Sequence, residues 1–103
     1  FQVYGCTVPF WVYKFAEGMI NAGIYVGFTR EEAREQIVEN LLGAAKELQL
    51  SGASPTAKIE ELTSPGGITI EAMRVLQESG DYSAPTIASM VEALKKCAAV
   101  ANR

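Results

Sequence analysis

The residues of this chain best suited to binding or catalysis form the run Ser64-Pro65-Gly66-Gly67-Ile68-Thr69, which stands directly before a helical pattern. Apolar residues at helical spacing follow, from Ile70 to Leu76, so the amides of Gly66 to Thr69 are expected to be the unpaired donors of a helix's first turn. Two glycines without β-carbons let a small molecule approach these amides, and the helix dipole favours an anion there. The pattern therefore predicts a site for a carboxylate or phosphate, with the Thr69 hydroxyl beside it.

The same run also fits a plain turn between two helices. Pro65 fixes its own φ angle, and the two glycines after it absorb the change of chain direction. The spacing alone is compatible with both the anion site and the turn. The motifs around the run distinguish the two interpretations.

Further motifs accompany the loop in a fixed order. Two of them precede it, Glu17-Gly18-Met19 and Leu42-Gly43-Ala44-Ala45-Lys46, and two follow it, Arg74-Val75-Leu76 and Ser79-Gly80-Asp81-Tyr82. In this order and at these intervals, the chain resembles the C-terminal helical domain of pyrroline-5-carboxylate reductase, the last enzyme of proline synthesis. The resemblance extends from about Pro9 to about Leu94.

The resemblance implies an oxidoreductase of proline biosynthesis that reduces 1-pyrroline-5-carboxylate to L-proline with NADPH or NADH. In that family an N-terminal Rossmann domain carries the cofactor, whereas this sequence contains no glycine fingerprint of the strand-turn-helix type. We therefore expect residues 9–103 to be a C-terminal dimerisation and substrate-binding domain, residues 1–8 to be a linker or a remnant of an upstream junction, and the fragment alone to bind no cofactor and be inactive. The resemblance also implies a homodimer or higher homo-oligomer in the cytoplasm.

The resemblance assigns roles to single residues of the loop. The substrate-binding residues it implies are Ser64, Pro65, Gly66, Gly67 and Thr69. The backbone amides are expected to hold the substrate carboxylate, and Thr69 matches the family's threonine beside the imine nitrogen. A threonine hydroxyl is a poor acid at neutral pH, so the catalytic role expected of Thr69 is to orient the ring nitrogen or to pass a proton from water. Ile68 is assigned packing only.

The chain departs from the family pattern at its first helix. The family usually has Ser-Gly-Ser-Gly-Pro-Ala-Tyr there, and this chain has Gly5-Cys6-Thr7-Val8-Pro9-Phe10-Trp11. The alternatives that this leaves are a divergent paralogue without reductase activity and a non-catalytic helical oligomerisation module. A third is the helical domain of a β-hydroxyacid-type dehydrogenase, which would lack the Ser-Pro-Gly-Gly-x-Thr spacing.

The elements that must position the loop are all predicted to be helices. Thr7 and Pro9 predict a helix start for residues 9–22, and the capping box formed by Thr29 and Glu32 starts a second helix that reaches Leu50. Further helices are expected over 55–62 after Ser54, over 68–78, and from a cap at Ser83 to the end of the chain. The fold class is therefore all-α, a bundle of about five helices, and the resemblance implies that this bundle is intertwined in a dimer. The first helix is apolar nearly all round, which predicts burial in a bundle or against a second subunit.

The composition limits the partners and the chemistry. The chain has 103 residues, 49% of them hydrophobic, and a net charge of −3 with both signs interspersed. These values fit a single oligomeric domain and give neither a basic patch for nucleic acid nor a membrane anchor. There is no histidine, and the two cysteines, Cys6 and Cys97, cannot form a zinc site, so we expect no metal. Both thiols are expected to be reduced.

Overall fold

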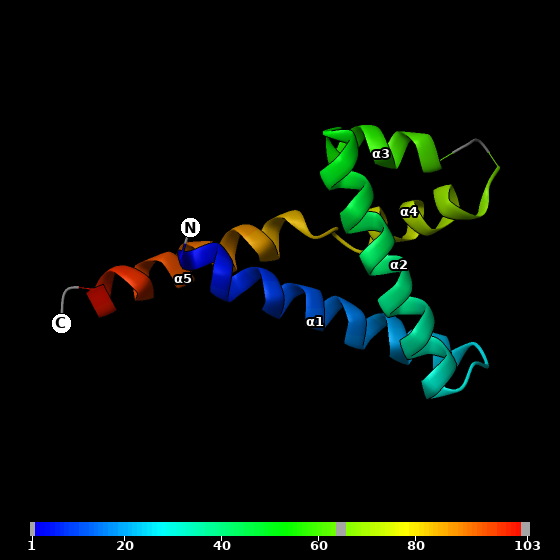
Figure 1. Ribbon diagram of the computed structural model, residues 1–103, viewed down its shortest axis with the longest axis horizontal. Coiled ribbons are helices and arrows are strands. Elements are labelled where there is room, and N and C mark those ends of the chain that lie inside the picture. The colour runs from blue at the N-terminus through cyan, green and yellow to red at the C-terminus, as the bar shows by residue number, and fades with distance from the viewer. Residues whose placement is uncertain (1, 64–65, 102–103) are drawn as a thin grey trace. The chain divides into compact units, whose positions relative to one another are not determined.

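The computed structural model of this chain describes residues 2–63 and 66–101, and these residues form five α-helices (Figure 1). The helices are α1 (Gln2–Tyr25), α2 (Arg30–Ser51), α3 (Pro55–Leu62), α4 (Ile68–Glu78) and α5 (Ser83–Ala101). The described residues contain no β-strand, which confirms the all-α prediction. The chain divides into two units, Phe1–Ser51 with α1 and α2, and Gly52–Arg103 with α3, α4 and α5. None of the described helices is long and apolar enough to cross a membrane.

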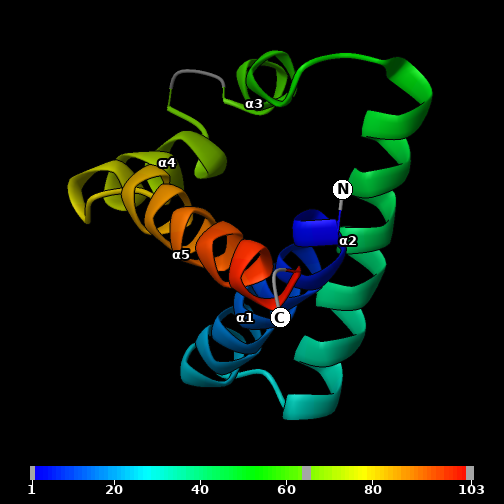
Figure 2. The same cartoon turned by 90° about the vertical axis from the view of Figure 1, so that its left-hand side faces the viewer.

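In the first unit, α1 and α2 form a helical hairpin (Figure 2). A Schellman motif ends α1, because Gly27 has a φ of 111° and the N–H of Phe28 donates to the Gly23 carbonyl at 3.0 Å. The predicted capping box then starts α2. The Glu32 carboxylate accepts from the Thr29 N–H at 3.0 Å, and the Thr29 hydroxyl accepts from the Glu32 N–H at 3.1 Å. The prediction from Thr29 and Glu32 is therefore confirmed.

The predicted start of the first helix is wrong. Helix α1 begins at Gln2, and Pro9 lies inside it. Thr7, predicted to precede the helix, is a helical residue whose hydroxyl donates to the Val3 carbonyl at 2.7 Å. The prediction rested on the preference of proline for the first turn of a helix. Inside a helix, proline removes its own N–H and disturbs the carbonyl four residues earlier, here that of Gly5, and the helix can continue on both sides of it. No helix end coincides with the predicted boundary at residue 9.

In the second unit, local signals in the sequence set most of the helix ends. Ser54 caps α3 by accepting from the Ala57 N–H at 3.2 Å, with Pro55 in the first turn. Helix α4 ends in a Schellman motif, because Gly80 has a φ of 101° and the Asp81 N–H donates to the Leu76 carbonyl at 3.1 Å. The predicted cap of the last helix is displaced by one residue. Ser83 is the first residue of α5, and the preceding carbonyl, that of Tyr82, accepts from the Thr86 N–H at 3.0 Å.

The chain by itself has almost no hydrophobic core. Ala33 is the one buried apolar residue in the part of the chain that the structure describes, with 6% of its surface exposed. Helix α1, predicted to be buried, has no buried residue. Its burial was inferred from an apolar surface on all sides, and within the first unit that surface packs against α2. Both cysteines are free thiols, Cys6 exposed and Cys97 half-buried.

Candidate functional site

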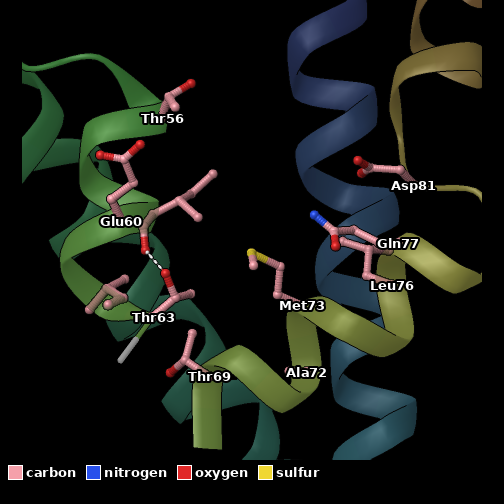
Figure 3. A pocket seen from close by; sticks show the side chains of 11 residues that line it. Thr56, Glu60, Thr63, Thr69, Ala72, Met73, Leu76, Gln77 and Asp81 are labelled. Carbon is pink, nitrogen blue, oxygen red and sulfur yellow. Dashed lines mark hydrogen bonds between the residues drawn. The ribbon is translucent and has the colours of Figure 1, made fainter. Parts of the chain in front are cut away.

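The second unit contains a cavity of about 520 Å³ between α3 and α4 (Figure 3). Most of its wall is apolar, and polar side chains from both helices border it. The lining residues are Thr56, Ile59, Glu60, Leu62, Thr63, Thr69, Ala72, Met73, Leu76, Gln77 and Asp81. Thr69, the residue to which the sequence assigns a catalytic role, is therefore part of the cavity wall.

Helical spacing explains why these side chains meet. On α4 the lining positions are 69, 72, 73, 76 and 77, which recur every three or four residues and so share one face. On α3 the same spacing applies from Thr56 to Thr63. At the C-terminus of α3, the Thr63 hydroxyl donates to the Ile59 carbonyl at 2.8 Å, which fixes its rotamer. Figure 3 shows Thr63 and Thr69 at the end of the cavity formed by the end of α3 and the start of α4.

The described part of the predicted substrate loop has the backbone of a helix start. Gly66 has a φ of 76°, a left-handed conformation that favours glycine. Gly67 is the N-cap of α4, and as a glycine it offers no side-chain oxygen to the N–H groups of the first turn. The N–H groups of a helix's first turn have no partner within the helix, so here their partners must come from outside it. Ser64 and Pro65, the other two predicted loop residues, lie outside the described residues.

Ile68 and Thr69 point to different surroundings. Thr69 lines the cavity but is exposed, whereas Ile68 is 93% exposed and does not line it. Among the described residues of the second unit, none covers the Ile68 side chain, so the packing expected of Ile68 is not seen within this unit. The start of α4 presents a hydroxyl toward the cavity and an apolar side chain away from it.

Sequence reasoning missed several polar residues of the cavity, chief among them Glu60, Gln77 and Asp81. The spacing of eight residues between Thr69 and Gln77 was a usable signal, because it places both on one face of α4. Asp81 has a φ of 61°, and its carboxylate accepts from the Tyr82 N–H at 2.7 Å. The sequence did not predict that Asp81 lies at the cavity, because the position of Asp81 depends on how the backbone turns at the end of α4.

The charged residues of α4 lie on another part of its surface. Arg74 pairs with Glu78, at 2.8 Å from Nη1, and with Glu71, at 3.0 Å from Nε. Hydrogen bonds to Glu71 and then to Glu78 raise the pKa of the Arg74 guanidinium. None of the three lines the cavity, and exposed ion pairs of this kind contribute little to stability. Within the described ranges, no group of three or more Cys, Asp or Glu side chains has the geometry of a metal site.

Comparison with known proteins agrees with the resemblance that the loop motifs suggested. The sequence matches the family described as "Pyrroline-5-carboxylate reductase dimerisation" over residues 2–100. It is 37% identical to the pyrroline-5-carboxylate reductase of Escherichia coli over 89 residues, which cover 86% of this chain and 31% of that protein. It is 39% identical to pyrroline-5-carboxylate reductase 2 of Bacillus subtilis over 71 residues, 69% of this chain and 26% of that protein.

The chain covers only part of the length of these relatives. The reductase of Aquifex aeolicus is 36% identical over 72 residues, which cover 70% of this chain and 27% of that protein. The chain thus spans about a third or less of the curated relatives it matches. No solved structure matches the chain. The match over residues 2–100 establishes that the chain belongs to the pyrroline-5-carboxylate reductase dimerisation family.

Proposed function

We propose that this chain is the C-terminal domain of a pyrroline-5-carboxylate reductase, which reduces 1-pyrroline-5-carboxylate to L-proline, and that it supplies the substrate loop and the dimer interface. The observation that carries the proposal is the family match over residues 2–100, in a chain where Thr69 lines a cavity at the start of α4. The 103 residues contain no dinucleotide fingerprint, so the proposal places NADPH or NADH in another part of the full-length enzyme. That cofactor supplies the hydride.

The chemistry of the substrate fits the start of α4. Pyrroline-5-carboxylate is a cyclic imine with one carboxylate. The first-turn amides, from Gly66 to Thr69, hold the carboxylate, and Ser64 and Pro65 complete the loop in the proposal. The Thr69 hydroxyl then orients the ring nitrogen, which gains a proton as the neighbouring carbon gains a hydride. This arrangement fixes the substrate at two points and leaves the reacting carbon open on one side.

The proposal includes the assembly and the location of the enzyme. The domain pairs with a second copy in an intertwined homodimer or a higher homo-oligomer, which the name of its family and its many exposed apolar side chains support. The enzyme works in the cytoplasm, where its substrate is a small imino acid. Its activity requires neither nucleic acid nor a membrane.

A second candidate function is a helical oligomerisation module without catalysis, as in a paralogue that has lost the reductase activity. The observation that favours it is the segment Gly5 to Trp11, which departs from the family pattern and forms part of the continuous helix α1. In that case, Gly66 and Gly67 form only a turn between α3 and α4.

An activity assay on the full-length protein separates the two. We expect oxidation of NADPH or NADH that depends on pyrroline-5-carboxylate, and none from the isolated 103-residue chain with either cofactor. A full-length protein that forms dimers by sedimentation but turns over with neither cofactor would favour the oligomerisation module. Turnover by the isolated chain would contradict the assignment of the cofactor to another domain.

A further inference from the structure

Within α4, which the structure describes throughout, one long apolar side chain lies on the cavity face close to Thr69. Thr69 is followed on that face by Ala72 and Met73, and only then by Leu76. Ala72 contributes a single methyl group. Leu76 comes seven residues after Thr69, which places it about 10 Å farther along the helix axis. Met73 is therefore the large apolar group of α4 that is nearest to Thr69 on the cavity wall.

The Met73 side chain extends from α4 into the cavity (Figure 3). It is half-buried, whereas Thr69 is exposed. A side chain in a helix leans toward the N-terminus of that helix and covers the turn before its own α-carbon. Met73 follows Thr69 by four residues, so the turn that it covers is the one that begins with Thr69. A ligand at Thr69 would have the Met73 thioether as its next neighbour along α4.

The substrate of the proposed function has one apolar edge. In 1-pyrroline-5-carboxylate, the ring carbon that carries the carboxylate is bonded to the imine nitrogen, so the two polar groups lie on one side of the ring. The other edge consists of two methylene groups. If the first-turn amides of α4 hold the carboxylate and Thr69 orients the nitrogen, the two methylene groups face away from both, into the cavity. The proposed function gives these methylene groups no contact.

The cavity as a whole does not limit the size of the ring. Its volume of about 520 Å³ falls in the range of pockets that hold drug-sized ligands, which are much larger than a five-membered ring with one carboxylate. A limit on ring size must therefore come from a side chain that enters the cavity close to Thr69. Methionine suits this place, because its unbranched and flexible thioether fills irregular apolar gaps.

We propose that Met73 determines the ring size that the enzyme prefers, because its side chain closes the cavity against the two methylene groups of the five-membered ring. A ring with one further methylene group meets the Met73 side chain and binds less well. The inference rests on the proposed function, which places the carboxylate and the nitrogen of the substrate. One methylene group in an apolar pocket typically changes kcat/KM by about 10- to 200-fold, so the effect is large enough to measure.

The test measures kcat/KM of the full-length enzyme for 1-pyrroline-5-carboxylate and for its six-membered homologue, the cyclic imine with one more ring methylene. We expect Met73→Ala to shift the ratio of the two values about ten- to a hundredfold toward the larger ring. For the five-membered substrate, the loss should appear mainly as a higher KM, because the contact with the methylene groups is made equally in the ground state and in the transition state. Met73→Leu, which conserves the volume, should keep the ratio within about threefold of the parental value.

Val75→Ala is the matched control, because Val75 belongs to the same helix, is 49% exposed and does not line the cavity. It should keep the parental ratio. Circular dichroism checks the fold of each variant, and Met73→Val, which removes less of the side chain, replaces Met73→Ala if the latter does not fold. A parent that reduces the five-membered ring, with folded Met73 variants at the parental ratio or with an equal shift in Val75→Ala, would overturn the inference alone. A parent that reduces neither ring would overturn the proposed function and this inference with it.

Discussion

Gly23 of α1 and Ala33 of α2 approach each other so closely that a β-carbon added to Gly23 would lie 2.9 Å from the Ala33 β-carbon. Real β-carbons do not come this near, so the hairpin keeps its spacing only with glycine at this position. Ala33 is also the one residue that the described part of the chain buries, at 6% exposure. At this point the approach of α1 and α2 therefore depends on the absence of a side chain on one helix and a single methyl group on the other.

Gly23→Ala should destabilise the protein by about 1–3 kcal/mol, because the new methyl group forces α1 and α2 apart. Gly18→Ala is the matched control. It lies in the same helix, and a β-carbon there meets nothing within 4 Å. Its gain in helix propensity should stabilise by up to about 1 kcal/mol. Urea unfolding of both variants at one protein concentration checks the prediction, and an equal effect of the two substitutions would contradict the close approach.

Glu32→Gln should reduce the dependence of stability on pH in the acidic range. Hydrogen bonding to the Thr29 backbone, and then to its side chain, lowers the pKa of Glu32 from the usual 4.5. A carboxyl whose pKa is lower in the folded state contributes stability above about pH 4.5, and this contribution is lost as the pH falls through the folded pKa. Glutamine preserves the capping box but does not titrate in this range.

Unfolding curves from pH 6 to pH 3 measure the effect of Glu32→Gln. A smaller decrease in stability than in the parent is the expected outcome, and identical decreases would show that the cap does not depend on the charge. Glu17 contributes in the same range, because its hydrogen bond and ion pair with Lys14 lower its pKa too. The variant should therefore diminish the pH dependence without abolishing it.

Local signals in the sequence were sufficient for α3 and α4, whose bounds agree with the prediction. Ser54, Gly67 and Gly80 act on the backbone within a few residues, so their effect does not depend on the rest of the fold. Pro9 was misleading, because proline is compatible with the first turn of a helix and with its interior at some cost. The cavity beside Thr69 could not be predicted from the sequence, since it depends on how the faces of α3 and α4 meet.

Gly67→Val in the full-length enzyme should raise KM strongly and leave the fold and the dimer intact. Gly67 has a φ of −83° and a ψ of 170°, an extended conformation that valine adopts without strain. The change therefore places a branched side chain beside the first-turn amides of α4 without altering the path of the backbone. Steady-state kinetics with pyrroline-5-carboxylate, together with circular dichroism, provide the measurement. An unchanged KM would mean that the substrate does not approach these amides.

Thr69→Ala in the full-length enzyme should lower kcat and kcat/KM together, with little effect on stability. Thr69 is exposed at the cavity, so its removal disturbs no core contact. If its hydroxyl orients the reacting nitrogen, the loss of one hydrogen bond from the transition state, about 1.5–3 kcal/mol, reduces both constants roughly ten- to a hundredfold. Thr63→Ala is the control, because its hydroxyl is engaged with the Ile59 carbonyl of its own helix and should leave kcat close to the parental value. Parental rates for both variants would instead favour a structural turn before α4 and the oligomerisation module.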